Sequence, residues 1–296
     1  TQSVFASVEV GWKSMLYLTL TGRNDWASQL ANSSTPCFFY PSVGLSGVIS
    51  EMLTLPEFID YMKVRGSFSS VGMPYPRNLT SPTYEYDEAN QQWKPKTHYP
   101  IKDLKPERTN SWELGLDMRL FKDFSLGFSW YLANTFNQTF DPKVSVSSGY
   151  SKIYLQTGYV RNSGVELSLG YGHTWNNHLH WESNFTLSHN KNTIKDLVTS
   201  YIHPETGLPI TQNRLDVGGL GKARFILKKG GTLGDLYTQS DLKRDNSGMV
   251  EIDPSGALTT EDNLPDIKLG SVFPKANLAW NNRFEWRGIS LSALFT

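Results

Sequence analysis

Apolar and polar residues alternate strictly over about ten positions at several places along the chain. The clearest segment runs from Trp112 to Leu120, where every second residue is apolar and the residues between are charged or glycine. Residues 124–133 repeat the pattern, with Phe, Leu and Trp alternating with Ser, Gly, Tyr and Ala. A period of two places successive side chains on opposite faces of a β-strand. The pattern therefore predicts strands with one apolar face and one polar face.

Ten segments of this kind are predicted as strands. They cover residues 3–12, 15–24, 38–50, 62–71, 111–120, 123–137, 161–174, 178–190, 273–286 and 288–296. The connections between them alternate between short and long. The short ones are residues 13–14, 122–123, 176–177 and 287–288, together with 51–61, which has room for one helical turn. The long ones are residues 25–36, 72–110, 138–160 and 191–272.

This alternation of connection lengths favours a membrane barrel. Consecutive connections of an up-and-down barrel lie at opposite ends, so all the short turns would fall at one end and all the long loops at the other. Outer-membrane barrels have short periplasmic turns and long extracellular loops. A soluble β-sandwich also alternates apolar and polar residues, but its strands are usually only about 5–6 residues long. We therefore predict an all-β fold, a transmembrane antiparallel β-barrel.

The charged residues of these strands indicate which face meets lipid. A basic residue on the lipid face of a barrel costs about 2–4 kcal/mol at the bilayer midplane. The charged side chains should therefore point to the interior, and the small residues between them leave space there. The predicted lumen-facing polar residues are Glu113, Asp117, Arg119, Glu166 and Glu182.

Composition narrows the class of protein further. The 296 residues carry 28 basic and 28 acidic side chains, so the basic excess of a nucleic-acid-binding protein is missing. No stretch approaches the roughly 20 apolar residues of a membrane helix. Aromatic residues make up 13% of the chain, and nine of them are Trp, which is typical of membrane interfaces and also of sugar-binding proteins.

No cofactor or metal site is predicted. The single cysteine, Cys37, permits no internal disulfide, and the six histidines are scattered, with only His178 and His180 sharing a strand face. Asp245, Ser247 and Gly248 could suggest a calcium loop, but such a loop needs six to eight oxygen ligands and more acids at alternate positions. A solvated turn is the favoured interpretation. No nucleophile motif is present, so no enzyme activity is predicted.

The two ends of the sequence suggest a piece of a longer polypeptide. Residues 1–10 lack the basic region, the apolar region and the cleavage site of a signal peptide, and they have the pattern of a strand in progress. Residues 289–296 also stop inside a strand pattern.

Several short motifs resemble the SusC/RagA-type TonB-linked outer-membrane transporters. Leu104–Thr109 followed by Ser111–Asp117 is similar to their LKPE-T-S-ELGLD stretch, and Asn162–Leu167 is similar to their N-G-VEL strand start. The other similar segments, in the order that the family shows, are Pro41–Gly44, Met62–Phe68 with Val71–Gly72, Gly230–Tyr237, Asp245–Gly248 and Phe273–Lys275.

The resemblance implies a fold and a function. Members of the family have a signal peptide, an N-terminal extension, a TonB box, a plug domain and a barrel of about 22 strands. Residues 1–296 are then expected to be the C-terminal portion of the barrel domain, about ten strands, without the plug domain, the TonB box and the last strands. The implied function is TonB-dependent import of a large nutrient, a glycan or an oligopeptide, across the bacterial outer membrane.

The same resemblance implies partners. They are a SusD-like surface lipoprotein over the long loops, the TonB complex reached through the N-terminal region, the glycan or peptide ligand, and membrane lipid. A proline-stiffened, aromatic-rich loop is the predicted ligand or lid contact, unless it folds on itself and buries its rings. Its candidate contact residues are Tyr75, Tyr84, Tyr86, Trp93, His98 and Tyr99.

Two other interpretations remain open from the sequence. A self-contained ten-strand outer-membrane barrel could carry an enzyme in its loops, although such a barrel should begin and end cleanly. A soluble carbohydrate-binding β protein would also explain the aromatic content.

Overall fold

The computed structural model shows an all-β chain built around one large sheet. It describes residues 2–30, 33, 36–73, 84–95, 98–99, 105–140, 152–153, 155–175, 178–202 and 209–296. The described residues divide into two compact units, one formed by residues 1–191 and 275–296 and the other by residues 192–274. Among the described residues, no helix is both long enough and apolar enough to cross a membrane.

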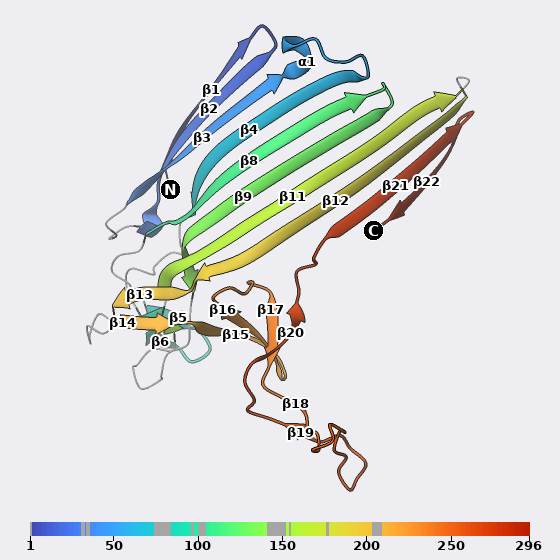
Figure 1. Ribbon diagram of the computed structural model, residues 1–296. Coiled ribbons are helices and arrows are strands. Elements are labelled where there is room, and N and C mark those ends of the chain that lie inside the picture. Colours follow the sequence, from blue (N-terminus) through green and yellow to red (C-terminus); the bar gives the residue numbers. More distant parts are fainter. Residues whose placement is uncertain are drawn as a thin grey trace. The chain divides into compact units, whose positions relative to one another are not determined.

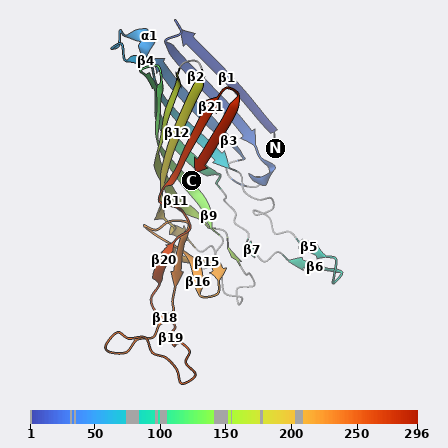
Figure 2. The same ribbon diagram turned by 90° about the vertical axis from the view of Figure 1, so that its right-hand side faces the viewer.

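The first unit is a ten-stranded antiparallel sheet in which each strand lies beside its neighbours in sequence (Figure 1). Seen from the side, the sheet is curved (Figure 2). Its strands, in spatial and chain order, are β1 (Gln2–Trp12), β2 (Leu16–Trp26), β3 (Cys37–Val48), β4 (Ile59–Met73), β8 (Glu107–Leu120), β9 (Phe124–Phe140), β11 (Leu155–Trp175), β12 (Leu179–Asp196), β21 (Asn277–Trp286) and β22 (Ile289–Phe295). All ten predicted strands are present, and their predicted up-and-down antiparallel order is confirmed.

The short connections are tight turns whose central residues have positive φ. Lys13 and Ser14 between β1 and β2 both have positive φ, and so do Lys122 between β8 and β9 and Arg287 between β21 and β22. Positive φ at both central residues is the geometry of a type I′ hairpin turn. The connection between β3 and β4 holds the predicted helical turn, α1 (Ile49–Met52). The predicted turn at residues 176–177 lies outside the described residues.

The apolar face of the sheet is solvent-accessible rather than packed against a second layer. Leu114 is 57% exposed and Phe128 is 39% exposed, and the other apolar-face positions of the central strands are exposed or half-buried. A β-sandwich would bury these side chains in a core about 10 Å thick. The residues that would have formed the interior of a soluble protein therefore form an outer surface.

The second unit is a small folded sheet inside the connection between β12 and β21. It contains β15 (Arg214–Leu220), β16 (Ala223–Lys228), β17 (Asp235–Thr238) and β20 (Ile267–Ser271), in that spatial order. Its core is formed by six buried apolar residues: Ile194, Leu197, Leu215, Ile226, Leu227 and Tyr237. From the sequence this segment is expected to be a loop, because its strands are too short to show a regular alternation.

One turn of the second unit bonds to the segments on both sides of it. The backbone of Ile194 exchanges hydrogen bonds with Gly230 and Gly231, and the amide of Val272 donates to the carbonyl of Gly234. The beginning and the end of the unit are thus both held by residues 230–234.

Several two-stranded ribbons complete the described structure. They are β5 (Tyr84–Asp87) with β6 (Gln92–Pro95), β7 (His98–Tyr99) with β10 (Lys152–Ile153), β13 (Val198–Ile202) with β14 (Pro209–Gln212), and β18 (Asp241–Leu242) with β19 (Thr260–Glu261). A short 3₁₀ helix, η1 (Ser28–Leu30), follows β2.

Candidate functional site

The polar face of the large sheet brings charged and hydroxyl side chains into rows across the strands. Arg65 of β4 lies directly opposite Gly115 of β8, which lies opposite Ser129 of β9, which in turn lies opposite Glu166 of β11. Because side chains alternate along every strand, the residues of such a row point to the same side of the sheet. The row therefore forms a polar strip four strands wide.

The side chain of Arg65 extends along this strip by passing over Gly115. A Cβ atom at Gly115 would lie 2.5 Å from the guanidinium carbon of Arg65, so only glycine leaves room for the side chain. Arg65 then donates from one amino group to Asp117, at 2.6 Å, and from the other to Ser129, at 2.7 Å. A carboxylate oxygen of Glu113 lies 3.5 Å away on its other side. One guanidinium thus joins three neighbouring strands.

A second glycine of the polar face, Gly164, also leaves room for a long side chain. A Cβ atom at Gly164 would lie 2.5 Å from the Tyr131 ring, which crosses from β9 over β11. The hydroxyl of Tyr131 donates to the amide oxygen of Asn190 on β12, at 3.2 Å. Glycine on the polar face therefore provides the space in which long side chains of adjacent strands lie across the sheet.

A groove of about 640 Å³ opens on this face. Arg65, Asp117 and Glu166 contribute its charged groups, and hydroxyl and apolar side chains from several strands line the rest. The hydroxyl-bearing lining residues are Ser129, Ser168, Thr186, Ser188 and Thr296. The groove thus offers hydrogen bonds of both kinds beside the apolar side chains of residues such as Phe128, Leu167 and Leu278. It suits an occupant with both polar and apolar parts.

All five predicted lumen-facing residues lie on this one face. Glu113, Asp117 and Glu166 surround the Arg65 strip, as described above. Arg119 and Glu182 line a second, smaller hollow of about 280 Å³, together with Asn184, which donates to Glu182 at 2.8 Å. That these residues face a lumen stays a prediction.

Arg65 is the residue that the sequence analysis missed. The signal was present, because the alternation in residues 62–71 places Arg65 on the polar face together with Lys63. Residues 62–71 were predicted as a strand, but Arg65 was not among the predicted lumen-facing residues.

The aromatic-rich loop presents a small hairpin, β5 paired with β6. Tyr86 and Trp93 lie opposite each other across it, with ring centroids 5.1 Å apart. Trp93 is 67% exposed and Tyr86 is 46% exposed, so the pair is not buried within the described part of the loop. The turn is closed by Asp87, whose carboxylate accepts from Ala89 and Asn90.

The other candidate residues of this loop are described less fully. Tyr84 belongs to β5, and His98 and Tyr99 form β7, which pairs in parallel with β10. Tyr75 lies outside the described residues.

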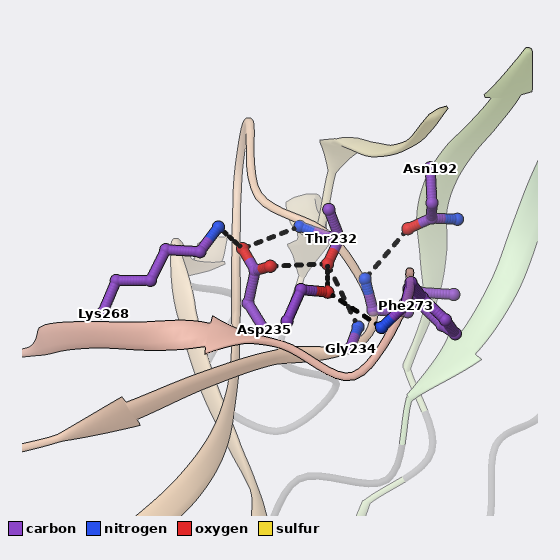
Figure 3. A network of polar contacts seen from close by, with 8 residues as sticks. Asn192, Thr232, Gly234, Asp235, Lys268 and Phe273 are labelled. Atoms are coloured by element: carbon purple, nitrogen blue, oxygen red, sulfur yellow. Dashed lines mark hydrogen bonds and ion pairs between the residues drawn. The ribbon is translucent and has the colours of Figure 1, made fainter. Parts of the chain in front are cut away.

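A buried carboxylate organises the second unit (Figure 3). Asp235 is fully buried and accepts hydrogen bonds from the ammonium of Lys268, at 2.6 Å, and from the backbone amide and hydroxyl of Thr232. Burial works to raise the pKa of Asp235, but the hydrogen bonds from Lys268 and Thr232 outweigh it and hold that pKa below its usual range. Gly234 in the same turn packs so closely on Phe273 that a Cβ would lie 2.8 Å from the ring.

A second carboxylate ties the four-stranded sheet together. Asp266 accepts two hydrogen bonds from Arg214 of β15, at 2.7 and 2.9 Å, and lies 2.8 Å from the ammonium of Lys228 of β16. The hydrogen bond from Arg214, together with Lys228, holds the pKa of Asp266 well below its usual range against the opposing effect of burial. Both acids stabilise the unit and leave no open ligand position.

The segment first considered as a calcium loop contains two similar turns. Asp245 accepts from the backbone of Ser247 and Met249, and eight residues later Asp253 accepts from Ser255 and Ala257 in the same way. Each carboxylate is used to close its own turn. Across the described part of the chain, no group of three His, Cys, Asp or Glu side chains is arranged to hold a metal ion.

Comparison with known proteins gives a consistent result. The family model "TonB dependent receptor-like, beta-barrel" matches residues 1–254. A curated relative, TonB-dependent receptor P39 of Formosa agariphila, is 24% identical over 271 residues, which are 88% of this chain and 23% of the relative. The chain therefore spans about a quarter of the length of that relative.

Solved structures share the fold. A structure described as the RagAB peptide transporter superposes with a TM-score of 0.76 at 19% identity, covering 99% of this chain and 32% of the other. The outer-membrane transporter YddB from Escherichia coli gives a TM-score of 0.53 at 11% identity, covering 96% of this chain and 38% of the other.

Proposed function

The chain belongs to the family of TonB-dependent receptor-like β-barrels, and from this premise we propose that it forms part of the barrel wall of a SusC-like nutrient importer. Its place is the outer membrane, where the barrels of this family lie. In the proposed importer the apolar face meets lipid and the polar face lines the lumen. Residues 1–296 would be the C-terminal portion of the barrel domain, and the plug domain and TonB box would come from other residues of the full protein.

The observation that carries this proposal is the arrangement of the ten-stranded meander. Its strands have an exposed apolar face, a polar face rich in small residues, and short and long connections at alternate ends. In water, an exposed apolar face of this size would be an aggregation site, whereas in a bilayer it is the required outer surface.

The two alternative functions lose support. In the described sheet, β1 and β22 are the two edges and do not pair with each other, as the walls of a self-contained ten-strand barrel would. The family consists of transporters rather than enzymes. A soluble carbohydrate-binding protein would bury the apolar face, which is exposed here.

The proposed cargo is a large nutrient, a glycan or an oligopeptide. Two solved structures with a similar fold are of a complex described as a peptide importer, in states described as closed-closed and open-open. By analogy, a SusD-like lipoprotein would cover the long loops, and the exposed Tyr86–Trp93 hairpin would contact either that lid or the cargo. The groove beside Arg65 would form part of the wall along which the cargo or the plug lies.

Growth on defined nutrients tests the function. The gene for the full protein is deleted, and the strain is grown on single glycans and on oligopeptide mixtures as the limiting nutrient. We expect loss of growth on one of these classes, restored by the wild-type gene.

The control is a gene copy that lacks the TonB box, which should be made and inserted but should not restore growth. Restoration by that copy would contradict energised import. Unimpaired growth of the deletion strain on every glycan and peptide source that supports the wild type would contradict the importer altogether.

A further inference from the structure

A row of polar residues interrupts the apolar face of the sheet on the side of the long loops. Ser70, Asn110, Asn134 and Arg161 lie directly opposite one another across β4, β8, β9 and β11. This set is called the outer polar row. Two residues earlier on β4, and two residues later on β8, the same face carries Phe68 and Trp112, whose rings are 4.6 Å apart. The change from aromatic to polar takes a single step of the pleat.

Such a boundary fixes the position of the membrane surface on this wall. Barrels have aromatic residues where the hydrocarbon ends, and polar side chains beyond that level. Because the outer polar row lies toward the long, extracellular connections, it faces the headgroup level of the outer leaflet. Arg108, the next outward residue of β8, lies one step further out, opposite Gly72 and Phe136.

The two arginines of this region are held in place by neutral groups. Arg108 donates from Nε to the hydroxyl of Ser70, at 2.6 Å, and Ser70 is only 2% exposed. Arg161 donates from Nε to the amide oxygen of Asn134, at 2.8 Å, and from Nη2 to the hydroxyl of Tyr159, at 2.6 Å. These bonds orient each guanidinium without neutralising its charge.

Two arginines of the polar face are arranged differently. Arg65 is paired with Asp117, and Arg283 with Glu285, whereas no carboxylate of the described residues forms an ion pair with Arg108 or Arg161. A guanidinium has five N–H donors, and the described residues use one of Arg108 and two of Arg161, which leaves donors for another acceptor. A charge at a lipid surface requires a counter-charge, and phosphate is the anion whose geometry suits paired guanidinium donors.

We propose that Arg108 and Arg161 bind the phosphate groups of lipid headgroups in the outer leaflet of the outer membrane. The ligand class is a phosphorylated glycolipid whose acyl chains lie against the aromatic residues below the outer polar row. The inference rests on the membrane placement of the barrel and not on import, so it can fail while the importer function stands.

Lipid binding to the full-length receptor tests the proposal. The purified receptor in mild detergent is titrated with lipid A carrying its phosphates or with dephosphorylated lipid A, and bound lipids are counted by native mass spectrometry. We expect tighter binding of the phosphorylated form. The double variant Arg108→Gln with Arg161→Gln should weaken that binding about tenfold, because two charge-assisted contacts are lost.

The control removes a guanidinium from the opposite rim of the same sheet. Arg287→Gln, in the short turn between β21 and β22, should leave lipid A binding unchanged. The heat-dependent shift in gel mobility shows whether each variant is folded, and the two single variants replace the double variant if it is not.

Three results would overturn the proposal. The first is equal binding of lipid A by the wild type and by the folded variants. The second is equal binding of phosphorylated and dephosphorylated lipid. The third is displacement of the lipid by low millimolar inorganic phosphate, which would indicate a site for free phosphate rather than for a headgroup.

Discussion

The guanidinium of Arg65 occupies the space that a side chain at Gly115 would fill. The two residues lie opposite each other on β4 and β8, and through this vacancy Arg65 reaches Ser129 on β9. A single glycine thus allows one side chain to cross-link three strands of the barrel wall, on the face where the groove lies.

Substituting that glycine should displace the arginine. In Gly115→Ala the new methyl group would overlap Nε and Cζ of Arg65, so the bonds to Asp117 and Ser129 should be lost. We expect a loss of about 1–2 kcal/mol in the free energy of unfolding, part of it relieved by rotation of the flexible arginine. Thermal unfolding of the full receptor in detergent measures it.

A matched control exists on the same face. Gly172 of β11 has nothing within 4 Å of its would-be Cβ, so Gly172→Ala should be close to neutral. In Arg65→Ala the cost of Gly115→Ala should largely disappear, because the two substitutions remove the same interaction. If Gly115→Ala lowers the free energy of unfolding equally in the wild type and in Arg65→Ala, this account is contradicted.

The exposed tryptophan of the β5–β6 hairpin should contribute to recognition. If Trp93 contacts the cargo or the lid protein, Trp93→Ala should weaken that binding about tenfold, because a large exposed ring buries much apolar area in a complex. Isothermal titration of the full receptor with its lid lipoprotein and with its nutrient separates the two partners. Glu88→Ala, in the turn of the same hairpin, is the control, and equal affinities for both variants would argue against the role.

Acid should loosen the second unit before the rest of the chain. The folded-state pKa values of Asp235 and Asp266 are depressed, so their stabilisation is fully present above the unfolded value of about 4 and is lost as the pH falls below it. The protection factors for hydrogen exchange at residues 224–228 of the full receptor, which are corrected for the intrinsic pH dependence of exchange, should therefore stay high from pH 7 to about 4 and fall at lower pH. Asp266→Asn should show the lower protection factors already at pH 7, and an identical profile for both proteins would refute the linkage.

Close packing at Gly234 should be sensitive to one added methyl group. Gly234→Ala would bring a Cβ to 2.8 Å from both Phe273 and Val272, neither of which ends in a flexible chain. We expect the second unit to lose about 2 kcal/mol of stability, seen as faster exchange at residues 224–228. Gly270→Ala in the neighbouring β20 has open space at its Cβ and should leave the exchange unchanged.

The strands of the large sheet could be predicted from the alternation of apolar and polar residues alone. Residues 112–120 show the period of two without interruption, and β8 contains them all. The prediction was shorter than the strand at β11, where residues 155–160 lie beyond the alternating region and contain two register shifts. Alternation is enforced only where one face meets lipid, so strand ends outside that level carry no such signal.

The second unit and the Arg65 strip could not be predicted, because both depend on contacts between residues that are far apart in the sequence. In the second unit the core joins Ile194, from the end of the long strand β12, with Leu215, Ile226 and Tyr237, which come from three short strands. The Arg65 strip required the register of β4, β8 and β9, which the sequence of one strand does not contain. The direction of each side chain could be predicted, but its partners could not.

The turn at residues 230–234, which bonds to both Ile194 and Val272, has a consequence for how the sheet is assembled. Strands β12 and β21 are neighbours although roughly eighty residues separate them, and closing so long a loop is entropically unfavourable. If the inserted unit folds first, its ends are already held together and the path between the strands shrinks to about a dozen residues, which lowers the closure penalty by about 2 kcal/mol. The inserted unit would then keep β21 close to β12, so that the two strands pair in register.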